Sequence, residues 1–175
     1  MMVKMVKRSP SSINFDCVIQ TFADDADFQK QLMQANVVIL PKMGVLHYTG
    51  PVFEADTREL YRYLRDHSSD KLRIEIAIRD EDYAEYVAHA DILELGKFLV
   101  CTLVAPFFVN ILSNYVSDKL KYRSTKENPK TTVRAELILT NKDGSSVSFK
   151  FDGPATAFEK ALGGEIREFI RGVKG

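Results

Sequence analysis

One histidine and two acids, spaced around a loop, are the residues of this chain best suited to acid–base chemistry. His47, Glu54 and Asp56 follow the apolar run 37–40, which ends at Pro41. A histidine beside carboxylates can act as a general base that a neighbouring acid orients. If 37–40 is a strand of an α/β sheet, the loop follows its carboxyl end, where such folds bind ligands. These three residues are candidate catalytic residues, with the alternative that Asp56 caps a helix and His47 lies in a surface turn.

A second group of side chains has the types and spacing of a metal site. Asp82, Glu85 and His89 follow Asp80, which can open a helix, and they would then lie within about one turn of each other. Two carboxylates and an imidazole can bind a metal ion. The alternative is a solvated helix face that carries ordinary charge pairs. We name these residues as metal candidates and expect no cofactor.

Other catalytic signatures are missing from the sequence. No serine lies in a Gly-x-Ser-x-Gly elbow, and Gly44 and Gly50 lack the spacing of a phosphate-binding loop. Cys17 and Cys101 lie in apolar surroundings without an activating base, and we expect both to be buried, reduced thiols. A nucleophilic hydrolase is therefore not supported, and we expect a protein that is not an enzyme.

The segment from 98 to 116 carries no charged residue, although 27% of the whole chain is charged. As one helix it would reach about 28 Å, close to the thickness of a bilayer core. However, Thr102, Pro106, Asn110 and Asn114 would form a polar stripe along it. We expect a helix that is buried in protein and kinked at Pro106, with a single membrane span as the alternative.

Alternating and helical apolar patterns predict the elements of the first half. Strand patterns cover 13–19, 37–40 and 72–78, and helix patterns cover 24–34, 56–66 and 80–90. Strands that alternate with helices indicate βαβ units and a partly parallel sheet.

The second half predicts a β-hairpin and closing helices. Strand patterns at 133–139 and 147–151 flank the turn residues 141–144. One or two helices over 158–170 should be interrupted or hinged at 163–164. The predicted fold class is α+β or α/β: a small mixed sheet with flanking helices, one long apolar helix near 95–120, and a C-terminal hairpin with a terminal helix. The expected parts are 1–91 and 92–175, or a single domain.

The order of elements from 92 to 162 resembles the effector-associated constant components of bacterial conflict and signalling systems. The resemblance rests on the strand Leu137–Thr140, on Asp143 and Gly144 in the turn, and on the alternation of Val147, Phe149 and Phe151. It implies a non-enzymatic accessory module that links a sensor to an effector.

Composition narrows the classes of function. The 24 basic and 24 acidic residues balance and the sequence pI is near 6.8, so there is no electrostatic case for nucleic-acid binding. No targeting segment is recognisable, so we expect a cytoplasmic protein, with a single-pass inner-membrane protein as the alternative.

The leading hypothesis is an interaction or accessory module that binds itself or a protein partner through an apolar helix. The alternatives are the membrane-anchored protein and a small-molecule-binding or enzyme domain that uses the region of His47 and Glu54. The expected interface residues of the leading hypothesis are Phe98, Leu99, Phe107, Phe108 and Ile111.

Overall fold

Helices and strands are mixed along the whole chain in the computed structural model, which describes residues 5–45, 47–87, 92–123 and 131–174. The strands are β1 (Val6–Ser11), β2 (Val37–Leu40), β3 (Phe53–Glu54), β4 (Ile74–Ile76), β5 (Glu85–Tyr86), β6 (Ile92–Cys101), β7 (Thr132–Thr140) and β8 (Ser146–Pro154). The α-helices are α1 (Phe15–Gln20), α2 (Ala26–Gln34), α3 (Thr57–His67), α4 (Ala105–Arg123) and α5 (Phe158–Lys174). Short 3-10 helices cover Asp80–Asp82, Thr102–Val104 and Ala155–Ala157.

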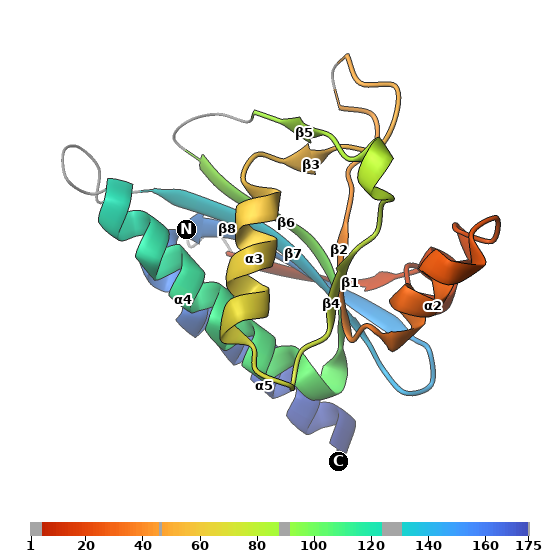
Figure 1. Cartoon of the computed structure of the whole chain (residues 1–175). Helices are drawn as coiled ribbons and strands as arrows, with labels where there is room; N and C mark the ends of the chain where they lie inside the picture. Colours follow the sequence, from red (N-terminus) through yellow and green to blue (C-terminus); the bar gives the residue numbers. More distant parts are fainter. Residues whose placement is uncertain (1–4, 46, 88–91, 124–130, 175) are drawn as a thin grey trace.

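Six of the strands form one mixed sheet in the order β1-β8-β7-β6-β2-β4 (Figure 1). The pairs β6–β7 and β2–β4 are parallel, and the other neighbours are antiparallel. Strands β3 and β5 form a separate parallel pair. The predicted class, a mixed sheet with flanking helices, is confirmed, and strands from both predicted parts of the chain share the sheet.

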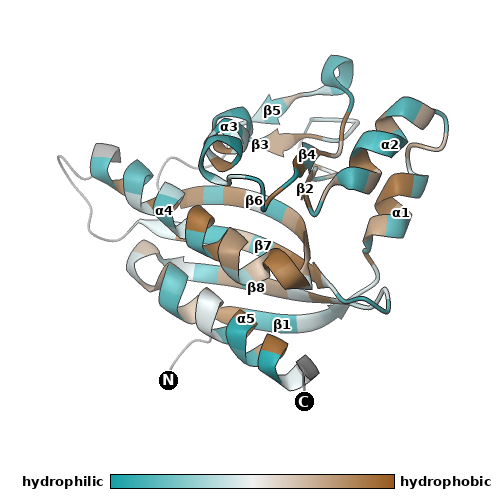
Figure 2. Cartoon of the chain, turned by 60° about the horizontal axis from the view of Figure 1, so that its bottom comes forward, coloured by the Kyte–Doolittle hydropathy of each residue, from teal (hydrophilic) through white to brown (hydrophobic). Residues whose placement is uncertain are grey.

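The sheet separates two apolar clusters because successive side chains of a strand point to opposite faces. Val37 and Ile39 of β2 belong to the larger cluster with residues of α3, α4 and α5, whereas Val38 and Leu40 join the smaller one with α1 and α2. Figure 2 looks onto the larger cluster, where α4 and α5 lie side by side across the sheet. Strand β4 is an edge of the sheet, with α2 and α3 flanking it from opposite faces.

The uncharged segment 98–116 is divided between a strand and a helix. Its first residues, Phe98 to Cys101, pair with β7 as the end of β6, and α4 begins only at Ala105. The expected helix is therefore wrong before Ala105, and Pro106 lies in the first turn, where it disrupts no helical hydrogen bond. Asn110 and Asn114 are on the exposed face of α4. No helix in the described parts of the chain is long and apolar enough to cross a membrane.

Two predicted elements of the first half have a different structure. The expected strand at 13–19 is helix α1, whose N-cap Asn14 accepts a hydrogen bond from the backbone N–H of Cys17 at 2.9 Å. Phe15, Val18 and Ile19 then pack on the smaller cluster. Both cysteines are free, as expected, but Cys17 is exposed and Cys101 is only half-buried.

The predicted helix over 80–90 is also wrong. A 3-10 turn ends at Asp82, and Glu85 and Tyr86 then pair with β3, so the chain becomes extended. Residues 88–90 lie outside the described part of the chain.

The C-terminal hairpin and helix are present, with one difference. Leu137 pairs with Phe149, and Gly144 takes a φ of 88° in the turn, as the sequence predicts. Helix α5 runs through Gly163 and Gly164 without a break, so the predicted hinge is wrong. Its buried residues repeat at helical spacing on both sides of the glycines, and they hold the helix on the sheet.

Candidate functional site

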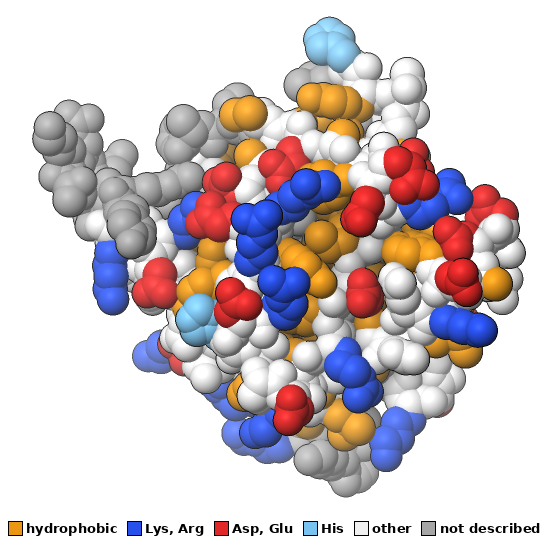
Figure 3. Space-filling view, viewed as in Figure 1, with side chains coloured by type: hydrophobic (Ala, Val, Ile, Leu, Met, Phe, Trp, Pro, Cys, Tyr) orange, Lys and Arg blue, Asp and Glu red, His pale blue; other side chains and the backbone are white. Residues whose placement is uncertain are grey.

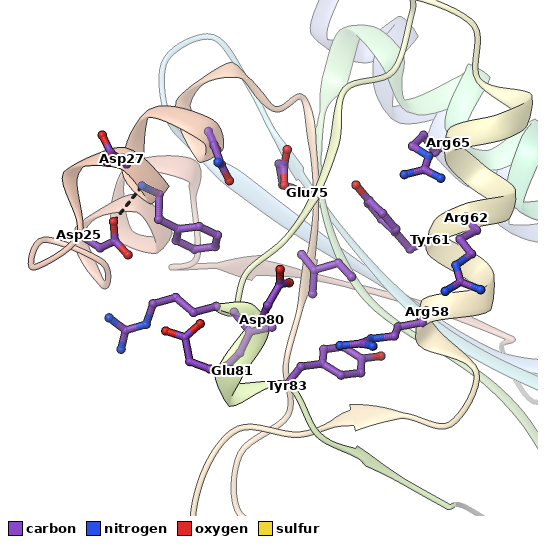
Figure 4. A pocket seen from close by; sticks show the side chains of 15 residues that line it. Asp25, Asp27, Arg58, Tyr61, Arg62, Arg65, Glu75, Asp80, Glu81 and Tyr83 are labelled. Atoms are coloured by element: carbon purple, nitrogen blue, oxygen red, sulfur yellow. Dashed lines mark hydrogen bonds between the residues drawn. The ribbon is translucent and has the colours of Figure 1, made fainter.

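A cleft of about 730 Å³ follows the open edge of β4 between α2 and α3 (Figure 4). Helix α3 forms one wall, α2 and the 3-10 helix Asp80–Asp82 form the other, and β4 with the residues that follow it forms the floor. The lining residues are Asp25, Asp27, Phe28, Gln31, Arg58, Tyr61, Arg62, Arg65, Glu75, Ile76, Ile78, Arg79, Asp80, Glu81 and Tyr83.

The α3 wall of the cleft is basic. Arg58, Arg62 and Arg65 recur at helical spacing, so they share one face of α3, and Figure 4 shows them on one side of the cleft. Leu60 and Leu64 occupy the opposite, buried face and fix the helix on the larger cluster. Among the described residues, neither Arg58 nor Arg62 forms an ion pair with an acid. The guanidinium of Arg62 is therefore available to a ligand, whereas that of Arg58 lies over the Tyr83 ring.

The opposite wall of the cleft is acidic. Asp25 and Asp27 come from the start of α2, and Asp80 and Glu81 come from the 3-10 turn. Asp25 also caps α2 by accepting a hydrogen bond from the backbone N–H of Phe28 at 3.1 Å. Figure 3 shows blue side chains over α3, an orange apolar strip beside them, and mostly red side chains, with blue ones among them, toward α2. Arg79 lines the cleft among these acids. The two walls therefore offer opposite charge across an apolar floor.

The floor exposes the backbone of an edge strand. Arg73 accepts a hydrogen bond from the N–H of Val37, and Ala77 donates one to Ile39 at 2.9 Å, so both face β2. Strand geometry alternates the direction of backbone groups, which turns those of Ile74 and Ile76 toward the open edge. The carbonyl of Ile76 already accepts the N–H of Ile78 at 2.8 Å. An incoming strand could pair with the N–H and C=O of Ile74 and the N–H of Ile76.

Aromatic and acidic side chains fix one end of the cleft. The Tyr83 ring stacks on Phe53 at 5.1 Å, and the Arg58 guanidinium lies 4.3 Å from the centre of the Tyr83 ring. The Tyr83 hydroxyl donates to Glu85 Oε1 at 2.6 Å. Burial and this hydrogen bond raise the pKa of Tyr83, so the hydroxyl stays protonated. Arg58 is thereby held over an aromatic ring at the mouth of the cleft.

Glu75 is the acid that β4 contributes to the cleft. Burial raises its pKa first, and the negative charge of Asp80 raises it further. A cationic side chain of a ligand placed there would favour the ionised carboxylate of Glu75 and offset the charge of Asp80. The floor therefore extends the preference of the acidic wall for basic side chains.

The predicted catalytic residues are not brought together. His47 is exposed in the loop that joins Lys42 to Val52, whereas Glu54 is buried at 1% exposure on β3. Asp56 starts α3 in a left-handed conformation with a φ of 71°, and its carboxylate lies 3.7 Å from Lys119 Nζ. Glu54 pairs with Lys42 instead, and the prediction of a base and orienter centred on His47 has no support in these contacts.

The predicted metal ligands Asp82 and Glu85 are engaged with other side chains. Asp82 pairs with Arg79 at 3.3 Å, and Glu85 accepts from Tyr83, whereas His89 lies outside the described residues. Within the described ranges, no group of three or more potential ligands is close enough to hold a metal ion. The helix that would have aligned Asp82 and Glu85 does not form.

The predicted interface side chains lie mostly inside the chain itself. Phe98, Leu99 and Phe108 are fully buried and Ile111 is 4% exposed, because β6 and α4 pack on the sheet and on each other. Phe107 is half-buried, with Lys71 Nζ 4.9 Å from its ring centre. Phe98, Leu99, Phe108 and Ile111 are therefore core residues and cannot form the expected apolar docking face.

Sequence reasoning missed the cleft, although part of it was visible. The spacing of Arg58, Arg62 and Arg65 on a predicted helix marks a basic face. The acidic wall and the open edge of β4 depend on strand order, which no local pattern reveals.

Comparison with known protein families, with curated proteins and with solved structures finds no match to this chain.

Proposed function

We propose that this protein is a non-enzymatic interaction module that binds an extended peptide segment of a partner in the cleft beside β4. The observation that carries the proposal is an open strand edge lying between two helix walls of opposite charge. Strand addition is a common way to recognise extended peptides, because backbone hydrogen bonds supply affinity and side-chain contacts supply specificity.

The charge of the walls defines the occupant. Successive side chains of an added strand point to opposite faces, so one set would meet α3 and the other set would meet α2. Acidic side chains suit Arg58 and Arg62, and basic ones suit Asp27 and Glu81. We therefore expect a segment in which acidic and basic residues alternate.

The binding experiment uses two fluorescent dodecapeptides of equal composition. One repeats Glu-Lys six times, which separates the charges onto two faces in a strand. The other arranges the same residues in pairs, Glu-Glu-Lys-Lys, which mixes both charges on each face. Fluorescence anisotropy should give a dissociation constant of about 10 μM for the alternating peptide and at least about tenfold weaker binding for the paired one.

Matched variants identify the wall. Arg62→Glu should weaken the alternating peptide about tenfold, since one charge-assisted contact becomes repulsive. Arg171→Glu makes the same charge change at an exposed position of α5 outside the cleft and should leave binding unchanged. Equal affinity for both peptides, or equal loss in both variants, would reject the proposal.

A further inference from the structure

A second charged site lies where β2 ends and β6 begins, around the carboxylate of Glu54. Lys42 Nζ is 3.2 Å from Glu54 Oε1 and 3.5 Å from Glu94 Oε2. The hydroxyl of Tyr86 accepts from Lys42 Nζ at 3.3 Å and donates to Glu94 Oε2 at 3.0 Å. Lys42 is thus held from three sides, and Glu54 is the most deeply buried acid of the group.

The Glu54 carboxylate is incompletely satisfied. Neither oxygen has a hydrogen bond of good geometry to a described residue, although Oε1 has the ion pair with Lys42. Oε2 lies against Gly96, where an added Cβ would be only 3.1 Å away. Gly96 has a φ of 121° at an irregularity of β6, so glycine both permits the backbone conformation and leaves room for the carboxylate.

Burial raises the pKa of Glu54, and the opposing effect of Lys42 is too small to cancel the increase. Ionised Glu54 therefore costs folding free energy, and a buried charged acceptor gains from any donor that reaches it. Both carboxylate oxygens are buried, but Glu54 lines a pocket with Glu94 and Asp152, so its charge acts on a cation bound there.

The pocket has a volume of about 210 Å³, which is room for about seven water molecules at ~30 Å³ each. It lies on the sheet face of α1 and α2, because Arg134 and Glu136 alternate with the core residues of β7. Cross-strand pairing places Glu136 between Lys97 and Lys150. In the part of the chain that the structure describes, neither lysine has an acid within ion-pair distance.

The two ends of the pocket therefore differ in charge. At one end, Glu54, Glu94 and Asp152 face Lys42 and Arg134, so acids exceed bases by one. The other end has the two lysines around one glutamate, whose Oε2 already accepts a hydrogen bond from the hydroxyl of Ser148 at 2.7 Å. A ligand with separated charges of both signs would complement both ends.

We infer that this pocket binds a small zwitterion, with its primary amine at the acidic end formed by Glu54, Glu94 and Asp152 and its carboxylate beside Lys97 and Lys150. This site lies apart from the peptide cleft and shares no lining residue with it. A metal ion is a poorer occupant, because Lys42 already fills the position of a cation beside Glu54 and Glu94.

The test uses a series of ω-amino acids as a ruler for the distance between the charged ends. Glycine, β-alanine, γ-aminobutyrate and ε-aminocaproate are titrated into the full chain by isothermal calorimetry, with butylamine and butyrate as probes of one end alone. We expect one length to bind with a dissociation constant of about 1 mM or below, at least about tenfold tighter than butylamine or butyrate.

Variants assign the ends. Glu54→Gln should weaken the preferred amino acid at least about tenfold and leave the weak binding of butyrate unchanged, because only the amine partner is lost. The double variant Lys97→Met and Lys150→Met removes the partners of the carboxylate. It should bind butyrate and the amino acid more weakly and bind butylamine as the parent does. Arg62→Glu, in the peptide cleft, should keep full amino-acid binding, which separates this inference from the proposed function.

Circular dichroism establishes that each variant is folded before its titration. If no amino acid binds more tightly than butylamine or butyrate, or if the folded Glu54→Gln variant binds like the parent protein, the inference is wrong.

Discussion

At the scale of single residues, Glu54 illustrates how far local sequence reasoning reaches. The sequence identifies it as a candidate for chemistry, but with His47 and Asp56 as partners. Its actual partner is Lys42, and its close neighbour is Gly96, which comes from a strand far along the chain. These contacts depend on how β3 lies against β6, which no short pattern determines.

Glu54 also gives a prediction about stability and pH. Burial raises its pKa in the folded protein above the value of 4.5 of the unfolded chain. The folded state therefore binds the proton more tightly, and the contribution of Glu54 to stability is full below about pH 4.5 and falls as pH rises through the folded pKa. Glu54→Gln should thus raise the free energy of unfolding by about 1 kcal/mol at pH 7, and the gain should shrink toward pH 4.5.

Urea unfolding of both proteins between pH 4.5 and 7.5 measures this difference. Lys42 keeps Glu94 and Tyr86 after the substitution and is partly exposed, so no isolated buried charge offsets the gain. Glu168→Gln, at an exposed position of α5, serves as the control and should show no such pH dependence. The account would be contradicted if the free energy of unfolding that Glu54→Gln gains over the parent were smaller at pH 7 than at pH 4.5.

At the scale of elements, the sequence predicts those whose pattern is long or whose turn chemistry is specific. The hairpin follows from the alternation on both sides of Gly144, and α2 and α3 follow from acidic residues before an apolar period. The segments 13–19 and 80–87 fail because each is short and its state depends on a distant partner. For Glu85 that partner is β3, and for Phe15 it is the smaller apolar cluster.

Helix α5 gives the prediction at this scale. Gly164 lies in its continuous part, and an added Cβ would meet nothing within 4 Å. Gly164→Ala should raise the free energy of unfolding by about 1 kcal/mol, because alanine loses less backbone entropy in a helix. At Gly163 the new Cβ would lie 3.0 Å from Arg167, so Gly163→Ala should gain less.

Chemical unfolding followed by circular dichroism at 222 nm compares these two variants with the parent. If α5 were hinged at the glycines, as the sequence pattern predicts, Gly164→Ala would strain the break and lower stability. A loss of stability in this variant would therefore speak against the continuous helix.

At the scale of the whole molecule, the sheet joins segments that the sequence assigns to two parts. Val6 of the first part pairs with Phe151 of the second, and Val37 pairs with Val100. The sequence predicts a mixed sheet with flanking helices, but strand order comes from contacts between distant segments. The position of β4 at the edge, and with it the cleft, is therefore a property of the assembled sheet.

A shared sheet predicts cooperative unfolding. Far-ultraviolet circular dichroism reports helices and strands, and tyrosine signals report packing in both sequence parts. Both probes should follow one transition with the same midpoint in urea, because neither part keeps its core after the other unfolds. Two separated transitions would mean that 1–91 and 92–175 unfold independently.

The central claim is that β4 accepts an added strand, and amide hydrogen exchange at Ile74 and Ile76 tests it most directly. With saturating alternating peptide, both amides should exchange at least about tenfold more slowly, while the amide of Asn110 on the exposed face of α4 serves as the reference. Two N-methylated peptides extend the test, one methylated at the odd positions and one at the even positions. Only the peptide whose methylated amides face β4 should fail to slow the exchange. Binding of the alternating peptide without slower exchange at Ile74 and Ile76 would contradict the claim.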